Sequence, residues 1–382
     1  MSHQPIYLDY NSTTPVDERV LEVMFPFFKE KFGNASSVYH TFGWDAEEAV
    51  DRARDQVANV IGAKSKEVIF TSGATEAINL ALQGTFEANK GDKNHIITCE
   101  TEHKAVLDTC DQLEKRGAKI TYLRVNTDGI IDIDEFRACI TNKTLLASFM
   151  YANNETGIMQ PIQKIGEVCE EKGILFFSDA TQAVGKIPCN LNELNTDMVA
   201  FSSHKMYGPK GVGALYIRRP SSIQPQIFGG GHEKGMRSGT LNVPGIVGFG
   251  QACELACELM EKDRERLQSL RDWLEKELLQ LGSVNINGAK SERLPHVSNV
   301  SFEDVEGSKL IRALKGIAVS QGSACNSSVI EPSHVLKAMG LSHQLAYSSI
   351  RISLGRFTSE VEARKAVQII RGAVEQLRMQ LQ

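Results

Sequence analysis

Short, continuously apolar runs alternate with segments of helical periodicity through much of the 382-residue chain. A strand that is apolar on both faces must be covered on both faces, so this alternation predicts a mostly parallel sheet between two layers of helices. The expected strands are 68–70, 95–98, 120–125, 145–151, 174–178, 198–201 and 212–217. The expected helices include 46–61, which precedes the first strand, and 75–88 and 162–172, which lie between strands. The predicted fold class is α/β, with a large doubly wound sheet.

The pattern of the sequence changes after Thr240. A long helix is predicted over 245–281, followed by short strands at 297–302 and 318–320 and by an amphipathic helix over 359–377. We therefore predict two domains. The large one covers residues 15–260, and a smaller α+β domain combines residues 1–14, with a strand at 6–8, and residues 261–382.

The charge balance argues against several classes of function. The chain carries 42 basic and 47 acidic residues without long blocks of one sign, for a net charge of −5. This argues against nucleic acid or an anionic membrane as the main partner. No run reaches the roughly 18 apolar residues of a membrane span, and residues 1–5 do not resemble a leader peptide. We expect a cytoplasmic protein without membrane or direct nucleic-acid binding.

The cysteines do not form a recognisable framework. Eight are present without a Cys-x-x-Cys pair, so disulfides and a structural zinc site are not expected. Cys253 and Cys257 lie four apart on the predicted long helix and are interpreted as packing residues. Cys325 differs, because its neighbours 321–324 and 326–328 are small or polar. Such a setting is typical of an exposed loop, where a thiolate can react.

Lys205 stands where a predicted buried strand gives way to the glycine-containing loop 206–211. Burial lowers the pKa of a lysine, and a neutral amine can condense with a carbonyl group. A solvated loop lysine is the alternative interpretation.

Three distant segments supply what such an amine would need. Residues 72–76 join a strand to a helix, where free N–H groups make an anion site, although a plain helix start capped by Ser72 or Thr75 is equally compatible. Asp179 ends an apolar strand and could pair with a pyridinium nitrogen or cap the next helix, and Gln182 could bond a ring hydroxyl. His103 could stack on a flat ring and move protons, or be structural. Together these features indicate pyridoxal 5′-phosphate (PLP).

Here the sequence resembles the NifS/IscS-type cysteine desulfurases, which belong to the class V aminotransferase family and to PLP fold type I. The resemblance runs from Tyr7 to Thr358. It is carried by the motifs at 72–76, 153–157, 179–182, 204–205, 237–240 and 322–325.

The resemblance implies a role for each matching residue. Lys205 would hold PLP covalently, and Asp179 would contact the ring nitrogen. His103 would stack on the ring and transfer protons. The other cofactor contacts implied are Ala74, Thr75, Ser202 and His204 to the phosphate, Thr240 to the phosphate of a second subunit, and Asn154 and Gln182 to the ring.

The resemblance also implies the reaction. Arg351 and Asn154 would bind the substrate L-cysteine, while Arg356 is interpreted as part of an ion pair. Cys325, on a mobile loop over about 320–332, would accept the sulfur as a persulfide and release alanine. The sulfur would pass to acceptors such as an iron–sulfur scaffold or a thiolation pathway, and a [2Fe–2S] cluster could be shared through Cys325. A homodimer is implied as well.

Two substitutions depart from the family pattern: Ser203 replaces a common glycine and Ala35 a usual proline. The chain also ends at Gln382, sooner than many relatives, which leaves the sulfur acceptor open. The alternatives are a selenocysteine lyase or transaminase on the same fold, and a non-catalytic scaffold protein.

Overall fold

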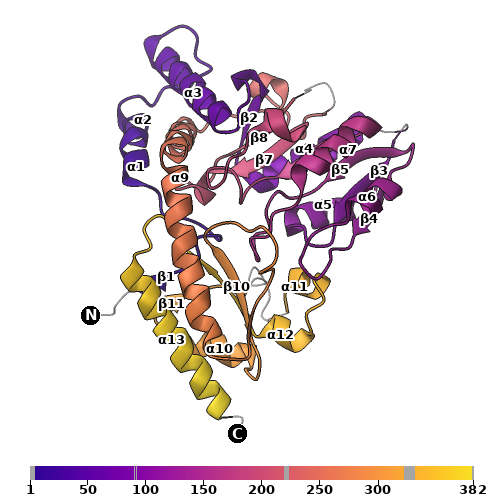
Figure 1. The fold of residues 1–382 in the computed structure, drawn as a ribbon. Coiled ribbons are helices and arrows are strands. Elements are labelled where there is room, and N and C mark those ends of the chain that lie inside the picture. Colours follow the sequence, from indigo (N-terminus) through magenta and orange to yellow (C-terminus); the bar gives the residue numbers. More distant parts are fainter. Residues whose placement is uncertain (1–4, 90, 92, 219–222, 322–331, 381–382) are drawn as a thin grey trace.

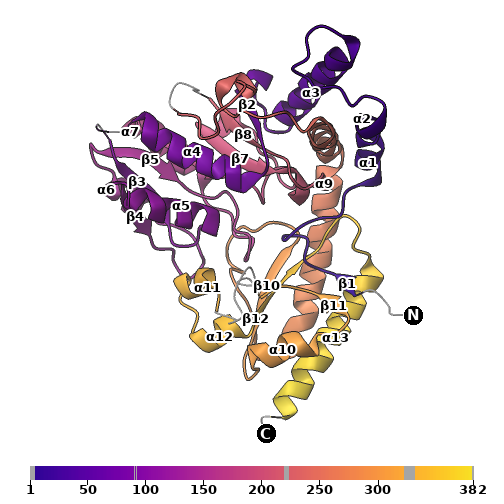
Figure 2. The ribbon, with the colours of Figure 1, turned by 180° about the vertical axis from the view of Figure 1, so that it is seen from behind.

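The computed structural model describes residues 5–89, 91, 93–218, 223–321 and 332–380 (Figures 1 and 2). Its main sheet has seven strands in the order β2-β8-β7-β6-β5-β3-β4. They are β2 (Val68–Thr71), β3 (His95–Cys99), β4 (Lys119–Leu123), β5 (Thr144–Ser148), β6 (Leu175–Asp179), β7 (Met198–Ser202) and β8 (Gly213–Ile217). Each lies within a few residues of a predicted strand, so the α/β prediction is confirmed.

Strand β8 is the exception to the parallel arrangement. The strands β3 to β7 run parallel, whereas β8 runs antiparallel to both β7 and β2. The short connection over 203–212 explains the direction, because parallel neighbours need a crossover of about a dozen residues or more. A continuous apolar run does not encode strand direction, so the sequence alone did not predict this.

Helices cover both faces of the sheet. On one face lie α4 (Ala74–Ala88) and α5 (Lys104–Glu114). On the other lie α3 (Thr41–Val60), α6 (Ile133–Cys139), α7 (Ile162–Lys172) and part of α9 (Val243–Leu279). Adjacent residues of a strand pack on opposite faces of the sheet. Phe177 packs with α4 and α5, and Phe176 packs with α6 and α7. This alternation is the reason why the strands are apolar throughout.

Helix α9 joins two hydrophobic cores. Its residues from Val243 to Ala256 pack in the core with α3, whereas those from Leu267 to Leu278 pack with the C-terminal helix α13 (Glu360–Met379). The change falls between Ala256 and Leu267. The domain boundary near residue 260 stays a prediction, and this change of core supports it.

The second core lies below the main sheet in Figure 1, beside both termini. It contains an antiparallel sheet of β9 (Val284–Ile286), β10 (Val297–Phe302) and β12 (Ser349–Ser353). Strand β1 (Ile6–Tyr7) pairs in parallel with β11 (Ile317–Ala318). The remaining α-helices are α1 (Glu18–Met24), α2 (Pro26–Lys29), α8 (Leu191–Leu194), α10 (Gly307–Ala313), α11 (His334–Ala338) and α12 (His343–Tyr347).

Local capping sets the ends of several helices. Helix α3 begins at Thr41, before the predicted residue 46, because Nδ1 of His40 accepts a hydrogen bond from the Gly43 N–H group. Helix α7 ends where Gly173 adopts a left-handed conformation with φ of 63°. Helix α13 starts with a capping box between Ser359 and Glu362. Within the described residues, no helix is long and apolar enough to cross a membrane.

Candidate active site

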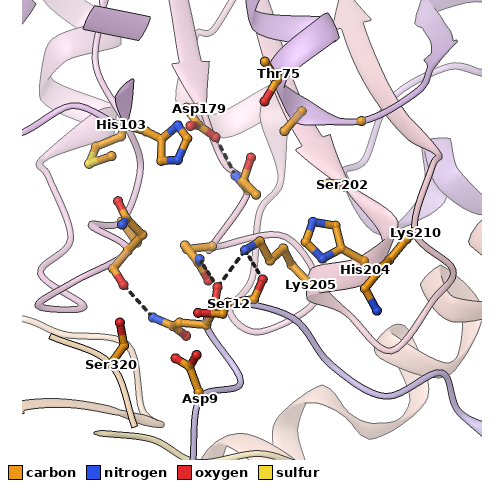
Figure 3. A pocket seen from close by; sticks show the side chains of 18 of the residues that line it. Asp9, Ser12, Thr75, His103, Asp179, Ser202, His204, Lys205, Lys210 and Ser320 are labelled. Carbon is orange, nitrogen blue, oxygen red and sulfur yellow. Dashed lines mark hydrogen bonds between the residues drawn. The ribbon is translucent and has the colours of Figure 1, made fainter. Parts of the chain in front are cut away.

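A cavity of about 800 Å³ lies at the carboxyl ends of β3, β5, β6 and β7 (Figure 3). Ligands in open α/β sheets bind at this edge. Strand β12 contributes Arg351, Ser320 forms an isolated bridge with Arg351, and the N-terminal segment contributes Asp9, Asn11 and Ser12. Among the predicted site residues, the cavity is lined by Ala74, Thr75, His103, Asn154, Asp179, Gln182, Ser202, His204, Lys205 and Arg351. The structure thus brings together ten of the predicted residues.

The anion cradle lies between β2 and α4. Gly73 is the N-cap of α4 and provides no side-chain cap, so the alternative of a helix start capped by Ser72 or Thr75 does not hold. Instead, the Ser72 N–H group donates to Oε2 of Glu76 at 2.9 Å. The N–H groups of the first helical turn are consequently left for an anion. Gly213 of β8 lies so close that an added Cβ would come within 2.7 Å of the Gly73 Cα.

Lys205 ends a short 3₁₀ turn (Ser203–Lys205) directly after β7. Its Nζ donates to the backbone oxygens of Asn11 at 2.7 Å and Ser12 at 2.6 Å. Figure 3 shows the side chain extended toward Ser12 across the floor of the cavity. The amine is therefore held at a defined position inside the cavity, as the covalent attachment of a cofactor requires.

His103 and Asp179 lie near each other on the far side of the cavity from Lys210 (Figure 3). His103 is the N-cap of α5, and its Nδ1 accepts from the Ala105 N–H group at 3.1 Å. A neutral ring in this arrangement carries its proton on Nε2. Asp179 ends β6, and its Oδ1 accepts from the Thr181 N–H group at 3.0 Å. Burial, and then the charge of Asp179, raise the pKa of the neighbouring Glu102 well above its ordinary value.

Gln182 is held by two neighbours. Its Nε2 donates to the Asn11 backbone oxygen at 3.0 Å, and its Oε1 accepts from Nζ of Lys186 at 2.6 Å. Burial, followed by the charges of Lys205 and Arg351, holds the pKa of Lys186 well below its ordinary value. The amide of Gln182 is thus fixed in one orientation.

His204 borders the cradle. Its Nδ1 lies 3.1 Å from the Thr13 hydroxyl. Burial, and then the charges of Lys205 and Lys210, lower the pKa of His204 to about 4. The ring is therefore neutral near pH 7. The Ser202 hydroxyl, at the end of β7, donates to the Val212 oxygen at 3.5 Å.

Arg351 enters the cavity from β12. Its Nη1 donates to the backbone oxygen of Asn154 at 2.8 Å. Its Nη2 donates to Oδ1 of Asp9 and to the Ser12 hydroxyl oxygen, each at 2.7 Å. Arg356 instead pairs with Asp263 and Asp17, outside the cavity lining, so its interpretation as an ion-pair residue is confirmed.

Two predicted residues do not appear in this cavity. Thr240 is exposed and is not part of the lining of its own chain's cavity. Cys325, with the predicted loop around it, lies outside the described residues, although Ser320 and Gln321 just before it line the cavity. Across the described part of the chain, no group of three or more His, Cys, Asp or Glu side chains could hold a metal ion.

Sequence reasoning missed Asp9, Asn11 and Ser12, which line the cavity, and Lys186, which donates a hydrogen bond to Gln182. The first three contact partners that are 143 to 342 positions away in the chain, so no local pattern marks them. Lys186 could have been found, because it interrupts the otherwise apolar run 183–187. A lysine in such a run indicates a buried amine with a polar partner.

The residues present fit PLP. The cavity combines an open helix N-terminus, a carboxylate at a strand end, an exposed imidazole and a positioned lysine amine. Two buried donors that line it, Oγ1 of Thr181 and Nε of Arg351, have no partner among the described residues. A ligand with acceptor oxygens would satisfy them.

Comparison with known proteins agrees with this site. Residues 6–365 match the family described as aminotransferase class-V. The chain is 52% identical to the cysteine desulfurase IscS of Histophilus somni (strain 129Pt), over 98% of this chain and 94% of the relative. A solved NifS-like protein superimposes with a TM-score of 0.92 at 40% identity, covering 97% of this chain and 100% of that one. A structure described as SspA in complex with cysteine gives a TM-score of 0.82 at 37% identity, covering 93% and 100%.

The fold and the site define a PLP-dependent enzyme of fold type I, and the chain belongs to the class-V aminotransferase family. Within that family it is a member of the NifS/IscS-type cysteine desulfurases.

Proposed function

We propose that this cavity converts L-cysteine to L-alanine and leaves the sulfur as a persulfide on Cys325. One observation carries the proposal: Lys205, Asp179 and Arg351, which come from three distant segments, line the same cavity. The family membership gives these residues their roles. When bound, PLP supplies the electron-withdrawing ring that makes the Cα proton and then the carbon–sulfur bond labile.

The side chains of the cavity have separate roles in binding the cofactor and in moving protons. Asp179 would keep the ring nitrogen protonated, and the first turn of α4 with Thr75, Ser202 and His204 would hold the phosphate. Gln182 and Asn154 would orient the ring. The free amine of Lys205 would take the Cα proton of the substrate. His103 would stack on the ring and exchange protons through Nε2.

Arg351 binds the substrate carboxylate, with Asn154 beside it. The Cys325 thiolate then attacks the substrate sulfur. The carbon–sulfur bond breaks, its electron pair stays with the carbon skeleton, and that skeleton leaves as alanine after protonation. Gln321, four positions before Cys325, lines the cavity, and four residues span at most about 14 Å.

The thiol chemistry is tested directly by mass spectrometry after incubation with L-cysteine. A gain of one sulfur atom is expected at Cys325, and the Cys325→Ala protein should no longer release alanine at the parental rate. Cys257→Ala is the matched control, because Cys257 is exposed, contrary to its interpretation as a packing residue, and lies outside the cavity lining. Unchanged sulfide production by Cys325→Ala in the presence of a reductant would refute the persulfide step and favour a lyase that releases the sulfur without a protein thiol, whereas a transaminase would form no sulfide from cysteine.

We also propose that the enzyme is a homodimer in which Thr240 serves the partner's phosphate site. The exposure of Thr240 supports this. So does an exposed apolar surface near the N-terminus, since monomers rarely leave so many large apolar side chains in water. That surface comprises Phe25, Phe28, Phe32, Val38, Tyr39, Phe42 and Trp44.

Subunit complementation tests the shared site. A mixed dimer of Lys205→Ala and Thr240→Val chains contains one site in which both residues are intact, provided that Thr240 acts across the interface. Activity should then reappear on mixing two inactive proteins. If Thr240 acts within its own chain, no intact site forms and the mixture stays inactive.

The molecule that accepts the sulfur from Cys325 is a further part of the proposal. Iron–sulfur scaffolds and thiolation enzymes are the acceptors that the family suggests, and a [2Fe–2S] cluster bridged by Cys325 would be cargo in transit. We place the enzyme in the cytoplasm and expect no nucleic acid as a direct partner. The described cysteines are all free thiols, as in a reducing compartment. Loading Cys325 with sulfur and adding candidate acceptors one at a time would show which of them removes it.

A further inference from the structure

The guanidinium of Arg351 already makes three hydrogen bonds within the protein before any substrate arrives. Arginine has five N–H donors. In Arg351, Nη1 donates to Asn154, and Nη2 donates both to the Asp9 carboxylate and to the Ser12 hydroxyl. Its Nε is buried and has no partner among the described residues, and the side chain is 5% exposed.

The planar shape of the guanidinium limits how a carboxylate can bind to it. A carboxylate binds a guanidinium in a bidentate manner along one of two edges, formed by Nε with Nη2 or by Nη1 with Nη2. Both edges use Nη2. Since both hydrogens of Nη2 are taken, a substrate carboxylate can bind in this way only by displacing Asp9 or Ser12.

We propose that Asp9 sets the affinity of the site for its amino-acid substrate by competing with the substrate carboxylate for Nη2 of Arg351. This inference rests on the role proposed above for Arg351. Asp9 is well placed for such competition, because its backbone is fixed independently of its side chain. The Asp9 oxygen accepts from the Tyr7 hydroxyl at 3.0 Å, and Asp9 forms a bridge with Ser353 of β12.

Competition for one nitrogen brings two like charges close together, and in a partly buried site such charges repel appreciably. The same repulsion acts on alanine, which has the carboxylate of cysteine, so Asp9 also promotes release of the carbon product. A site with an unopposed arginine would hold both molecules more tightly. Asp9 therefore keeps substrate binding moderate, which favours turnover.

The test is Asp9→Asn, which keeps the size and an acceptor oxygen but removes the charge. The KM for L-cysteine, from steady-state kinetics, and the Kd for L-alanine, from calorimetry, should each fall about three- to tenfold. The kcat should stay within about twofold of the parent. Asp263→Asn is the matched control. The Asp263–Arg356 pair has the same 2.7 Å distance, and both aspartates are 20% exposed, but Asp263 does not line the cavity.

A higher or unchanged Kd for L-alanine in Asp9→Asn would overturn the inference, since Asp9 would then only orient Arg351. Ser12→Ala provides a second route if Asp9→Asn does not fold. It frees one Nη2 hydrogen in the unbound protein, so the Kd should again fall, and a rise would contradict the competition. Arg351→Lys tests the role of Arg351 separately from the competition by Asp9. If this change leaves the KM for L-cysteine unaltered, the proposed role of Arg351 in substrate binding is wrong.

Discussion

The backbone oxygen of Asn11 accepts a hydrogen bond from Nζ of Lys205 at 2.7 Å, although the two residues are 194 positions apart. The same oxygen accepts from Gln182, and the Asn11 side chain bonds His296 and the Asn154 oxygen. One N-terminal residue therefore joins the reactive amine, a ring contact and the substrate side of the cavity. The geometry of the site depends on how firmly Asn11 is held.

Asn11→Ala is expected to lower the free energy of unfolding by about 2 kcal/mol. The change removes the acceptor of the His296 Nε2 hydrogen bond at 2.9 Å, and the His296 ring is buried. It also removes a donor to the half-buried Asn154 backbone oxygen, which still accepts from Arg351. Denaturant unfolding of the purified protein measures the effect. Asn59→Ala is the control, because the Asn59 side chain makes an exposed contact. A loss equal to that of Asn59→Ala would show that the Asn11 side chain is not needed.

The comparison between sequence and structure shows what local patterns can reveal. Runs that are apolar on both faces located the strands of the main sheet, because burial of both faces requires that composition. Positions at strand ends then located Asp179 and Lys205. The strand that carries Arg351 was missed, although residues 349–353 alternate polar and apolar side chains. That alternation indicates a strand, and here its polar side includes a residue that lines the cavity rather than solvent.

Non-local contacts explain most of what sequence reasoning could not reach. Ile6 pairs with Ile317, and this pairing places Asp9 to Ser12 against the site. Nothing within the first twelve residues indicates this position, because the partner strand is encoded at the other end of the chain. The competition between Asp9 and a substrate for Arg351 follows only once the donors of that one guanidinium are counted.

Glu233→Gln is expected to destabilise the protein by about 3 kcal/mol, because it leaves the buried Arg54 charge without a counter-charge. Glu233 accepts from both Nη atoms of Arg54 at 2.7 Å and from the Phe70 N–H group at 2.7 Å, and its side chain is 1% exposed. Glu233 and Lys234 also adopt φ of 48° and 58°, a strained conformation that this ion pair holds in place.

Chemical unfolding monitored by circular dichroism measures this loss. The control is Glu360→Gln, since Glu360 forms a surface pair with Arg364 in which both side chains are largely exposed. It should leave the unfolding midpoint almost unchanged. Equal behaviour of the two variants would mean that the buried pair contributes no more than a surface pair.

Asp17 should make stability depend on pH at the acidic end. The hydrogen bond with Arg19, and further contacts including one with Arg356, lower its pKa from 3.8 to about 2. A carboxyl whose pKa is lower in the folded state stabilises the protein above its unfolded pKa, and this stabilisation is lost as the pH falls from about 4 to about 2. Asp17→Asn should therefore cost about 2 kcal/mol at pH 7 and nothing near pH 2.

Asparagine caps helices as well as aspartate does, so this substitution isolates the charge. Unfolding curves for Asp17→Asn and the parent between pH 2 and 7 provide the measurement, with the difference in free energy plotted against pH. Asp132→Asn is the control, because Asp132 caps α6 at the surface. A difference that stays constant down to pH 2 would exclude titration of Asp17 as its origin.

Ser203→Ala is expected to stabilise the protein by about 1 kcal/mol. The Ser203 hydroxyl is fully buried and has no hydrogen-bond partner among the described residues. It lies against Gly208, where an added Cβ would come within 2.0 Å of it. Thermal unfolding checks the prediction against Ser348→Ala, in which a buried hydroxyl that donates to the Phe302 oxygen at 2.7 Å is lost and stability should fall. If both changes destabilise the protein, the Ser203 hydroxyl is hydrogen-bonded in solution.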